Sequence, residues 1–170
     1  MKNKVILCSA FLLGLSGCAS VPTVDSTVSN QMKSFEAPQK GNAGIYIYRE
    51  DAFVGAALKK YVYVDGECIG ETAPGVFFYH EVEGNKEHQV STESEFSENH
   101  LTILTEEGRN YFVNQYIKMG VFVGGAGVEL VDESKGKAEV LKVDMAEKGN
   151  CLICSSQTGH SIKRHFVVQS

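Results

Sequence analysis

Two cysteines near the C-terminus have a spacing that often carries chemistry. Cys151 and Cys154 are separated by two residues, and such a pair can form a redox-active dithiol, half of a zinc site or a structural disulfide. The interpretation favoured by the sequence is a local disulfide between them or a pair of inert thiols. The alternatives are a disulfide to Cys68 and a metal or redox function.

The neighbouring residues bear on the redox and metal alternatives. A thioredoxin-like site has its first cysteine at a helix N-terminus within a βαβ unit, whereas Cys151 follows a predicted helix. Ser155 occupies the position where haem attachment requires histidine. His160 and His165 could complete a zinc site with the two thiolates, but thiolate sites are uncommon where disulfides form freely. We therefore expect no metal and no cofactor.

Another cysteine, Cys18, lies where a lipid anchor would be attached. Two lysines near the N-terminus precede an apolar stretch at residues 5–15, which has the length of a secretory h-region and is too short to span a bilayer. The stretch ends in Leu15-Ser16-Gly17-Cys18, which resembles a bacterial lipobox. We therefore expect residues 1–17 to be a lipoprotein signal peptide and Cys18 to carry acyl chains that hold the protein on the membrane.

The expected location follows from this N-terminus. Ala19, rather than an aspartate, follows the cysteine, and by resemblance to the sorting rules of enteric bacteria this favours the outer membrane. The sequence therefore predicts an outer-membrane lipoprotein of the bacterial cell envelope that faces the periplasm.

The composition excludes some classes of protein. Of the 170 residues, 43% are hydrophobic and 22% are charged, which is typical of a globular domain. A net charge of −5 argues against a nucleic-acid partner, because binding to the phosphate backbone requires a basic surface. No serine–histidine–aspartate order and no paired carboxylates stand out, so we expect no catalytic residues and no enzyme.

The chain after the signal peptide has the pattern of a β protein. Runs rich in β-branched and aromatic residues alternate with turn residues at intervals of roughly 10 to 15 residues. Asp65-Gly66 joins two of these runs as a tight hairpin turn. The predicted strands cover residues 45–48, 61–64, 67–70, 76–80, 88–92, 100–105, 111–117 and 128–131. The pattern predicts a mainly β fold, either an antiparallel β-sandwich or a partly open barrel.

One C-terminal α-helix is predicted between Asp132 and Lys148, because apolar residues recur there on one helical face. Gly136 weakens the start of this helix, and residues 140–143 could instead alternate as a strand.

The predicted organisation has four parts. Residues 1–17 are the signal peptide, and residues 18–43 form a lipidated tether that holds the domain off the membrane, because they contain prolines and follow no regular period. Residues 44–148 form the β-sandwich domain with its helix. Residues 149–170 form a tail that carries the Cys-x-x-Cys pair.

The hairpin carries a motif that can be compared with known families. Residues 62–70 read Val-Tyr-Val-Asp-Gly-Glu-Cys-Ile-Gly, and with the Pro-Gly that follows they resemble the core of the PEGA-type surface β-domain. Over about residues 44–147 the arrangement is similar to a family of small bacterial lipoproteins known as domain of unknown function 2846. The segments that carry this resemblance are residues 45–49, 61–70, 110–115 and 129–133. The resemblance implies a PEGA-like, β-rich envelope domain and supplies no catalytic residues.

Two further patterns have alternative interpretations. Aromatic residues on the strands could stack against a glycan, but aromatics at period two are more often core residues. The glycine-rich run at residues 120–127 lacks the Gly-Lys-Ser/Thr of a phosphate loop and favours a bulged turn. Its apolar character also suits a loop that contacts a membrane or a partner. The strand aromatics are Tyr46, Tyr48, Tyr61, Tyr63, Phe77 and Tyr79.

These observations predict a protein that acts without catalysis. We expect a lipid-anchored binding or assembly module for another envelope protein or for peptidoglycan, attached to the membrane by its N-terminal lipid. The alternative is a thiol-dependent redox or metal-handling protein of the periplasm that uses Cys151 and Cys154.

Overall fold

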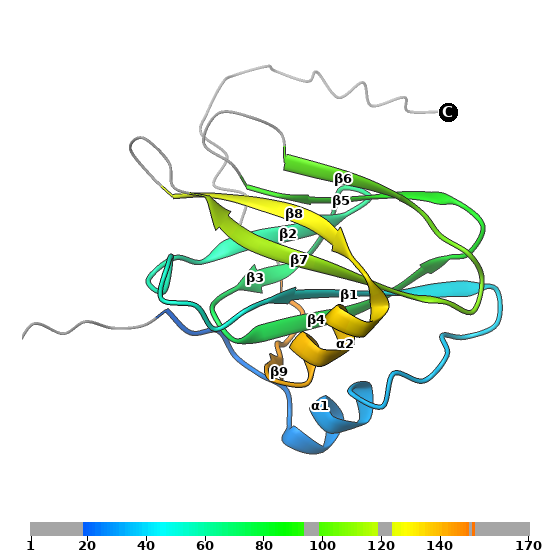
Figure 1. The fold of residues 1–170 in the computed structure, drawn as a ribbon, viewed down its shortest axis with the longest axis horizontal. Helices are drawn as coiled ribbons and strands as arrows, with labels where there is room; N and C mark the ends of the chain where they lie inside the picture. The colour runs from blue at the N-terminus through cyan, green and yellow to red at the C-terminus, as the bar shows by residue number, and fades with distance from the viewer. Residues whose placement is uncertain (1–18, 94–98, 119–123, 150, 152–170) are drawn as a thin grey trace, which may run out of the picture.

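The structure is a computed structural model that describes residues 19–93, 99–118, 124–149 and 151. Two β-sheets stack on each other, and two short helices cover the outer face of one of them (Figure 1). The result is three layers: helices, a five-stranded sheet and a four-stranded sheet. Within the described residues, no helix combines the length and the apolar character needed to cross a membrane.

The five-stranded sheet has the strand order β8-β7-β1-β4-β9, and the four-stranded sheet has the order β3-β2-β5-β6. The first sheet consists of β1 (Asn42–Arg49), β4 (Val76–Glu83), β7 (Asn110–Lys118), β8 (Gly125–Val131) and β9 (Asp144–Met145). The second consists of β2 (Lys60–Val64), β3 (Glu67–Thr72), β5 (Glu87–Thr92) and β6 (Asn99–Leu104). The helices are α1 (Ser26–Met32) and α2 (Glu133–Val140).

Strand β1 lies at the centre of the five-stranded sheet because both of its faces are apolar. Ile45 and Ile47 pack in the core between the two sheets, whereas Tyr46 and Tyr48 pack on the helix side, and all four are buried. A strand covered on both faces has no need of polar alternation. β1 pairs antiparallel with β4 and parallel with β7.

The core between the sheets is mainly aliphatic. The four-stranded sheet contributes one side-chain face to it, because alternate residues of a strand point to opposite sides. Its members include Ile45, Ile47, Val62, Val64, Ile69, Phe78, Val90, Ile103 and Val113.

Aromatic side chains fill the layer between the five-stranded sheet and the helices. Tyr46 stacks on Phe112 with ring centroids 5.1 Å apart, and its hydroxyl donates to the carbonyl of Met32 at 2.9 Å. Phe35 packs edge-on against both rings. Gly136 of α2 lies against Phe112, where a Cβ atom would overlap the phenylalanine side chain. Helix α2 therefore approaches the sheet this closely because residue 136 has no side chain.

The predicted mainly β sandwich is confirmed, and the two sheets do not close into a barrel. Each predicted strand has a counterpart among β1 to β8. The pairing differs from the antiparallel expectation in two places, because β1 with β7 and β4 with β9 are parallel pairs. Parallel neighbours need long crossover connections, and the connection between β1 and β7 contains β4 and all four strands of the second sheet.

The C-terminal helix is shorter than predicted. The described chain also has a second helix, α1, whereas one helix was predicted. Asp132 caps α2 by accepting from Lys135 N at 2.9 Å, and the helix ends at Val140, with Leu141 as its C-cap. Val143 and Ala146 are buried, because the chain then adds β9 to the edge of β4. This burial, rather than helix propensity, ends the helix. Helix α1 was not predicted.

The predicted tether is wrong for the described part of residues 18–43, which folds onto the domain. Val24 N donates to Met145 O at 3.0 Å, and the buried hydroxyl of Ser29 accepts from Met145 N at 3.0 Å. The segment therefore lies along β9 and the aromatic layer. Sequence patterns miss such docking because it uses single contacts from scattered residues rather than one periodic apolar face.

Candidate functional site

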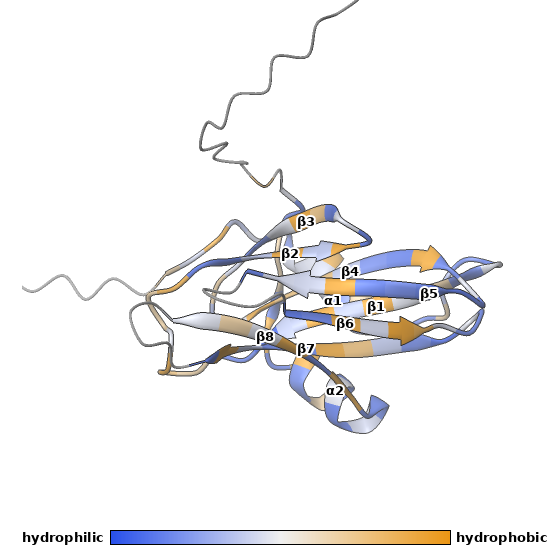
Figure 2. Cartoon of the chain, turned by 90° about the horizontal axis from the view of Figure 1, so that it is seen from above, coloured by the Kyte–Doolittle hydropathy of each residue, from blue (hydrophilic) through white to orange (hydrophobic). Residues whose placement is uncertain are grey.

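The outer face of the four-stranded sheet is left uncovered by the described helices. Along β5 and β6, Val90 and Ile103 point into the core, and Figure 2 shows hydrophilic and hydrophobic residues succeeding one another along these strands. The strand register places the alternate residues on the opposite side. This side, here called the open face, carries Tyr61, Tyr63, Gln89, Ser91, His100 and Thr102.

A hollow of about 270 Å³ lies on the open face. Tyr63 stands on one side of it and His100 on the other, with Ser91 between them in the strand register. Its volume is close to the lower limit for small-molecule pockets. Most such pockets enclose their ligand more than this hollow would. The shape suits part of a larger ligand that lies across the sheet. The residues that line it are Tyr63, Gln89, Ser91, Thr92, Glu93, Asn99 and His100.

Hydrogen bonds hold the base of the hollow. Thr92 Oγ1 donates to Tyr61 O at 2.8 Å and accepts from Gln115 Nε2 at 2.7 Å. Asn99 Nδ2 donates to Ala126 O at 2.5 Å. Since Gln115 and Ala126 belong to the five-stranded sheet, these bonds tie the hollow to the other layer and fix its shape before any ligand arrives.

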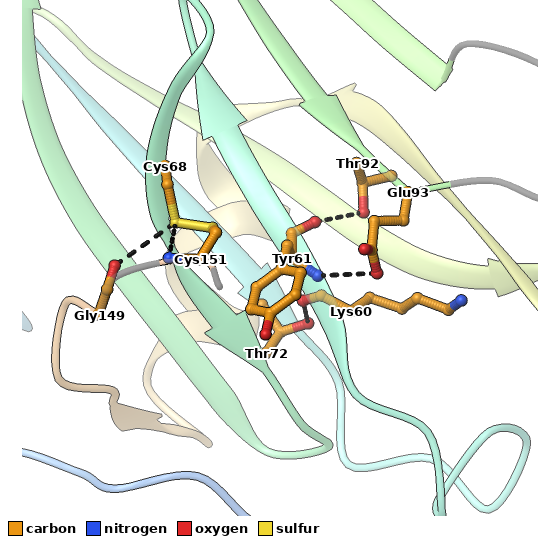
Figure 3. The surroundings of a disulfide bond; sticks show 8 residues. All are labelled: Lys60, Tyr61, Cys68, Thr72, Thr92, Glu93, Gly149 and Cys151. Carbon is orange, nitrogen blue, oxygen red and sulfur yellow. Dashed lines mark hydrogen bonds between the residues drawn. A yellow bond between two sulfur atoms is a disulfide. The ribbon is translucent and has the colours of Figure 1, made fainter. Parts of the chain in front are cut away.

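The groups around the hollow are polar and mostly neutral. Burial, followed by the nearby Glu93 carboxylate and Tyr61, raises the pKa of Tyr63, so its phenol stays protonated and can donate a hydrogen bond. Glu93 Oε2 accepts from Tyr61 N at 3.5 Å, and Figure 3 marks this contact with a dashed line. Hydroxyl, amide and aromatic groups together suit a ligand with hydroxyl or amide groups and a face that can stack on a ring.

A disulfide joins Cys68 of β3 to Cys151, beyond β9 (Figure 3). The two Cα atoms are 5.7 Å apart, and 83 positions separate them in the sequence. Gly149 N also donates to Ile69 O at 3.2 Å. The bridge and this hydrogen bond fasten the end of the domain to β3, at the opposite edge of the four-stranded sheet from β6.

The favoured local bridge between Cys151 and Cys154 is therefore not the pairing that the structure has. A sulfur atom forms one disulfide, and the sulfur of Cys151 is bonded to Cys68, as one of the two alternatives had it. Cys154, His160 and His165 lie outside the described residues. Among the described residues, no group of three or more His, Cys, Asp or Glu side chains is placed to hold a metal ion. The thiol-dependent alternative thus loses one of its two thiols.

A buried histidine below the hairpin turn is a feature that the sequence did not reveal. His88 is 4% exposed, its Nδ1 lies 2.6 Å from Asp65 Oδ2, and its Nε2 donates to Glu83 O at 2.7 Å. Burial raises the pKa of Asp65, but hydrogen bonds from His88 and from Gln89 N outweigh it, and the net shift is downward. The φ values of Asp65 and Gly66, 51° and 80°, confirm the predicted hairpin turn, which this cluster fastens to β5.

The other sequence-predicted residues separate into three groups. Tyr46, Tyr48 and Phe77 are buried in the aromatic layer, so the core interpretation of these aromatics is confirmed. Tyr61 and Tyr63 lie on the open face. Cys18 and residues 119–123 of the glycine-rich run lie outside the described residues.

Comparisons with known proteins support the predicted resemblance. The model of a family described as "Protein of unknown function (DUF2846)" matches residues 39–126. This match ends before α2, so it is shorter than the predicted range of 44–147. A protein of Haemophilus influenzae with the name "Uncharacterized protein" is 51% identical over 147 residues, which cover 84% of this chain and 86% of that protein. No solved structure matches the chain.

Proposed function

Because the chain belongs to the DUF2846 family, whose description states no activity, we propose that it is a lipid-anchored protein of the bacterial cell envelope that acts as a non-catalytic binding or assembly module. Its ligand is another envelope protein or peptidoglycan, and its binding surface is the open face. The observation that carries this proposal is the contrast between one sheet that is covered on both sides and one that presents a preformed polar hollow.

The chemistry of the open face supports a binding role. Tyr63 offers a ring and a protonated hydroxyl, and Gln89 and Ser91 add an amide and a second hydroxyl. Peptidoglycan and an extended peptide both present amides, and the glycan strands add hydroxyls and sugar faces that stack on aromatic rings. The hydrogen bonds of Thr92 and Asn99 hold the strands that carry these groups, which lowers the entropic cost of binding.

Two features support an envelope location. The h-region at residues 5–15 and the lipobox that ends at Cys18 predict export and acylation. The disulfide between Cys68 and Cys151 suits an oxidising compartment, because such bonds are rare in the reducing cytosol. Ala19 after the acylated cysteine favours the outer membrane, with the domain on the periplasmic side.

The binding role is tested by filling the hollow. A Ser91→Lys substitution places a long charged side chain among Tyr63, Glu93 and His100, and it should lower binding to purified peptidoglycan, or cross-linking to a protein partner in intact cells, by about tenfold or more. Leu141→Lys is the matched control, because Leu141 is an exposed apolar residue on the helix side. Equal binding by both variants would remove the open face from the proposal.

The anchor is tested separately. Cys18→Ser should abolish the incorporation of labelled palmitate and leave an unprocessed precursor or a soluble periplasmic form. Normal labelling of this variant would contradict the lipid-anchored assignment.

A further inference from the structure

Residues 51–59, in the loop between β1 and β2, present an aromatic side chain to solvent at one end of the sandwich. Phe53 is 96% exposed, and its neighbour Val54 is also exposed. Phenylalanine is among the residue types most often buried in folded proteins. Two adjacent apolar side chains are therefore exposed to solvent at the tip of a loop, which indicates a contact outside the domain.

The loop holds Phe53 in a fixed position. The guanidinium of Arg49, which is 3% exposed, donates to Gly55 O and to Leu58 O, each at 2.7 Å. Ala56 N donates to Phe53 O at 3.1 Å, which closes a turn. A Cβ atom on Gly55 would lie 2.6 Å from the side chain of Ile117, and φ at this glycine is +79°. The loop backbone is thus hydrogen-bonded to the side chain of Arg49 on β1 and packed against Ile117 on β7.

The same loop holds the first described residue of the chain. Ala19 N donates to Ala56 O at 2.9 Å. Cys18 is bonded directly to Ala19, and consecutive Cα atoms lie 3.8 Å apart. From Ala19 the chain runs back along the domain toward α1 and β9 (Figure 1). No spacer therefore separates the acylated residue from the loop.

We propose that residues 51–59 lie on the lipid bilayer, with Phe53 and Val54 inserted into its interfacial region beside the acyl chains of Cys18. This inference rests on the proposed lipid anchor. Acyl chains must lie within the bilayer, and a residue that follows them directly cannot hold its neighbours far from the surface. The loop is the part of the domain that this connection brings to the lipid.

The charges near the loop identify the kind of lipid surface. Glu50 and Asp51 precede Phe53, and Lys59 and Lys60 follow it, so the loop and its flanks carry no net charge. The insertion therefore depends on apolar burial and not on attraction to anionic headgroups. A zwitterionic bilayer suffices, and contact should not weaken as salt is raised.

The chain offers a direct test because it contains no tryptophan. The full acylated protein carrying Phe53→Trp is reconstituted into phosphatidylcholine vesicles, and the emission is compared with and without brominated acyl chains. We expect a blue-shifted emission that the brominated lipids quench. Leu104→Trp is the matched control, since Leu104 is 67% exposed and is the last residue of β6. The turn that follows it lies at the start of β1, where Gly108 N donates to Asn42 O, whereas the loop with Phe53 follows the end of β1. The emission of this control should be neither shifted nor quenched.

Flotation of the same samples with the vesicles reports the anchor independently. If the protein floats but the Phe53→Trp emission matches that of the Leu104→Trp control, the inference is overturned and the anchor stands. If the purified protein carries no acyl chains and does not float, the anchor and the inference both fail. Cross-linking from residue 53 to an envelope protein in cells, together with unquenched emission in vesicles, would assign the loop to a protein partner and also overturn the inference.

Discussion

The two sheets of the sandwich differ in what their outer faces contact. The five-stranded sheet is covered by the aromatic layer under α1 and α2, and its central strand β1 is buried along nearly its whole length. The four-stranded sheet buries only one face, and β5 and β6 alternate between buried and exposed positions.

This difference shows on which sheet the apolar residues are buried on both faces. Tyr46 and Tyr63 are both strand tyrosines with apolar neighbours, yet Tyr46 stabilises the domain and Tyr63 lines the hollow of the open face. The polar groups of the open face are not needed for stability, yet they are held in fixed positions. The open face is therefore the better place to seek a ligand. The following predictions test this division.

The largest effect is expected for Tyr46→Ala. The substitution removes a stacked ring and its hydrogen bond to Met32 O from the buried aromatic layer. By analogy with other buried aromatic truncations, it should lower the free energy of unfolding by about 3 to 5 kcal/mol. Denaturant titration measures this loss, and a loss below about 1 kcal/mol would show that the helices do not seal the layer.

The disulfide should contribute somewhat less. Replacing Cys68 and Cys151 by serine opens a loop that spans 83 positions, and disulfides typically stabilise by about 2 to 4 kcal/mol, more for longer loops. This is a larger effect than a local bridge between Cys151 and Cys154 would give. Cys154→Ser is the control and should leave the melting temperature unchanged. A larger loss from Cys154→Ser than from Cys68→Ser would contradict the pairing.

Gly136→Ala tests how tightly α2 is packed on the covered sheet. On helix propensity alone, alanine should stabilise this position by about 1 kcal/mol. Because a Cβ atom would overlap Phe112, we expect instead a loss of about 1 to 3 kcal/mol, typical of overpacking. Lys135→Ala, at an exposed position of the same helix, is the control. A gain in stability at position 136 would mean that α2 can move away from the sheet without cost.

A smaller effect concerns the acid stability that Asp65 contributes at the turn between β2 and β3. The folded pKa of Asp65 lies below its ordinary value, so its contribution is present above the unfolded pKa, about 3.9, and is lost as the pH falls through the folded pKa. The side chain is half-exposed, which limits the effect to under about 1 kcal/mol. Denaturation of wild type and Asp65→Asn between pH 6 and pH 2 should show a difference in stability that shrinks on acidification. A difference in stability that stays the same at every pH would show that the loss on acidification does not come from Asp65.

The smallest change in stability is expected on the open face itself. Gln89→Ala, at an exposed residue that lines the hollow, should alter the free energy of unfolding by about 0.5 kcal/mol or less, as for most surface substitutions, while ligand binding falls. A loss comparable to that of Tyr46→Ala would remove the distinction between the two sheets.

The sequence predicts the strands well because they are marked by local signals. Alternation, aromatic and β-branched runs and the Asp65-Gly66 turn each depend on neighbouring residues, and the structure has a strand at every predicted place. The hairpin turn is an example, since two adjacent positive φ values favour the Asp-Gly pair.

The remaining features depend on residues far apart in the sequence. The docking of Ser29 on β9 joins positions 116 apart, and no local period announces it. The partner of Cys151 could not be chosen from spacing, because a short spacing to Cys154 says nothing about which sulfur the fold brings near. The His88–Asp65 contact joins positions 23 apart and also has no local signal. The carbonyls that Arg49 binds are nearer in the sequence, but no periodic pattern marks a buried guanidinium that holds a loop.

The parallel pairing of β1 with β7 has a consequence for the order in which the chain can fold. Gly44 pairs with Asn110, so the central strand acquires its second neighbour only after most of the domain has been synthesised. Topologies dominated by such distant pairs fold slowly, because the chain entropy of closing a long loop is lost before the contacts compensate for it. The contacts of α1 with β9 need an even later segment of the chain. The first residues of the domain to be made are therefore among the last to become ordered.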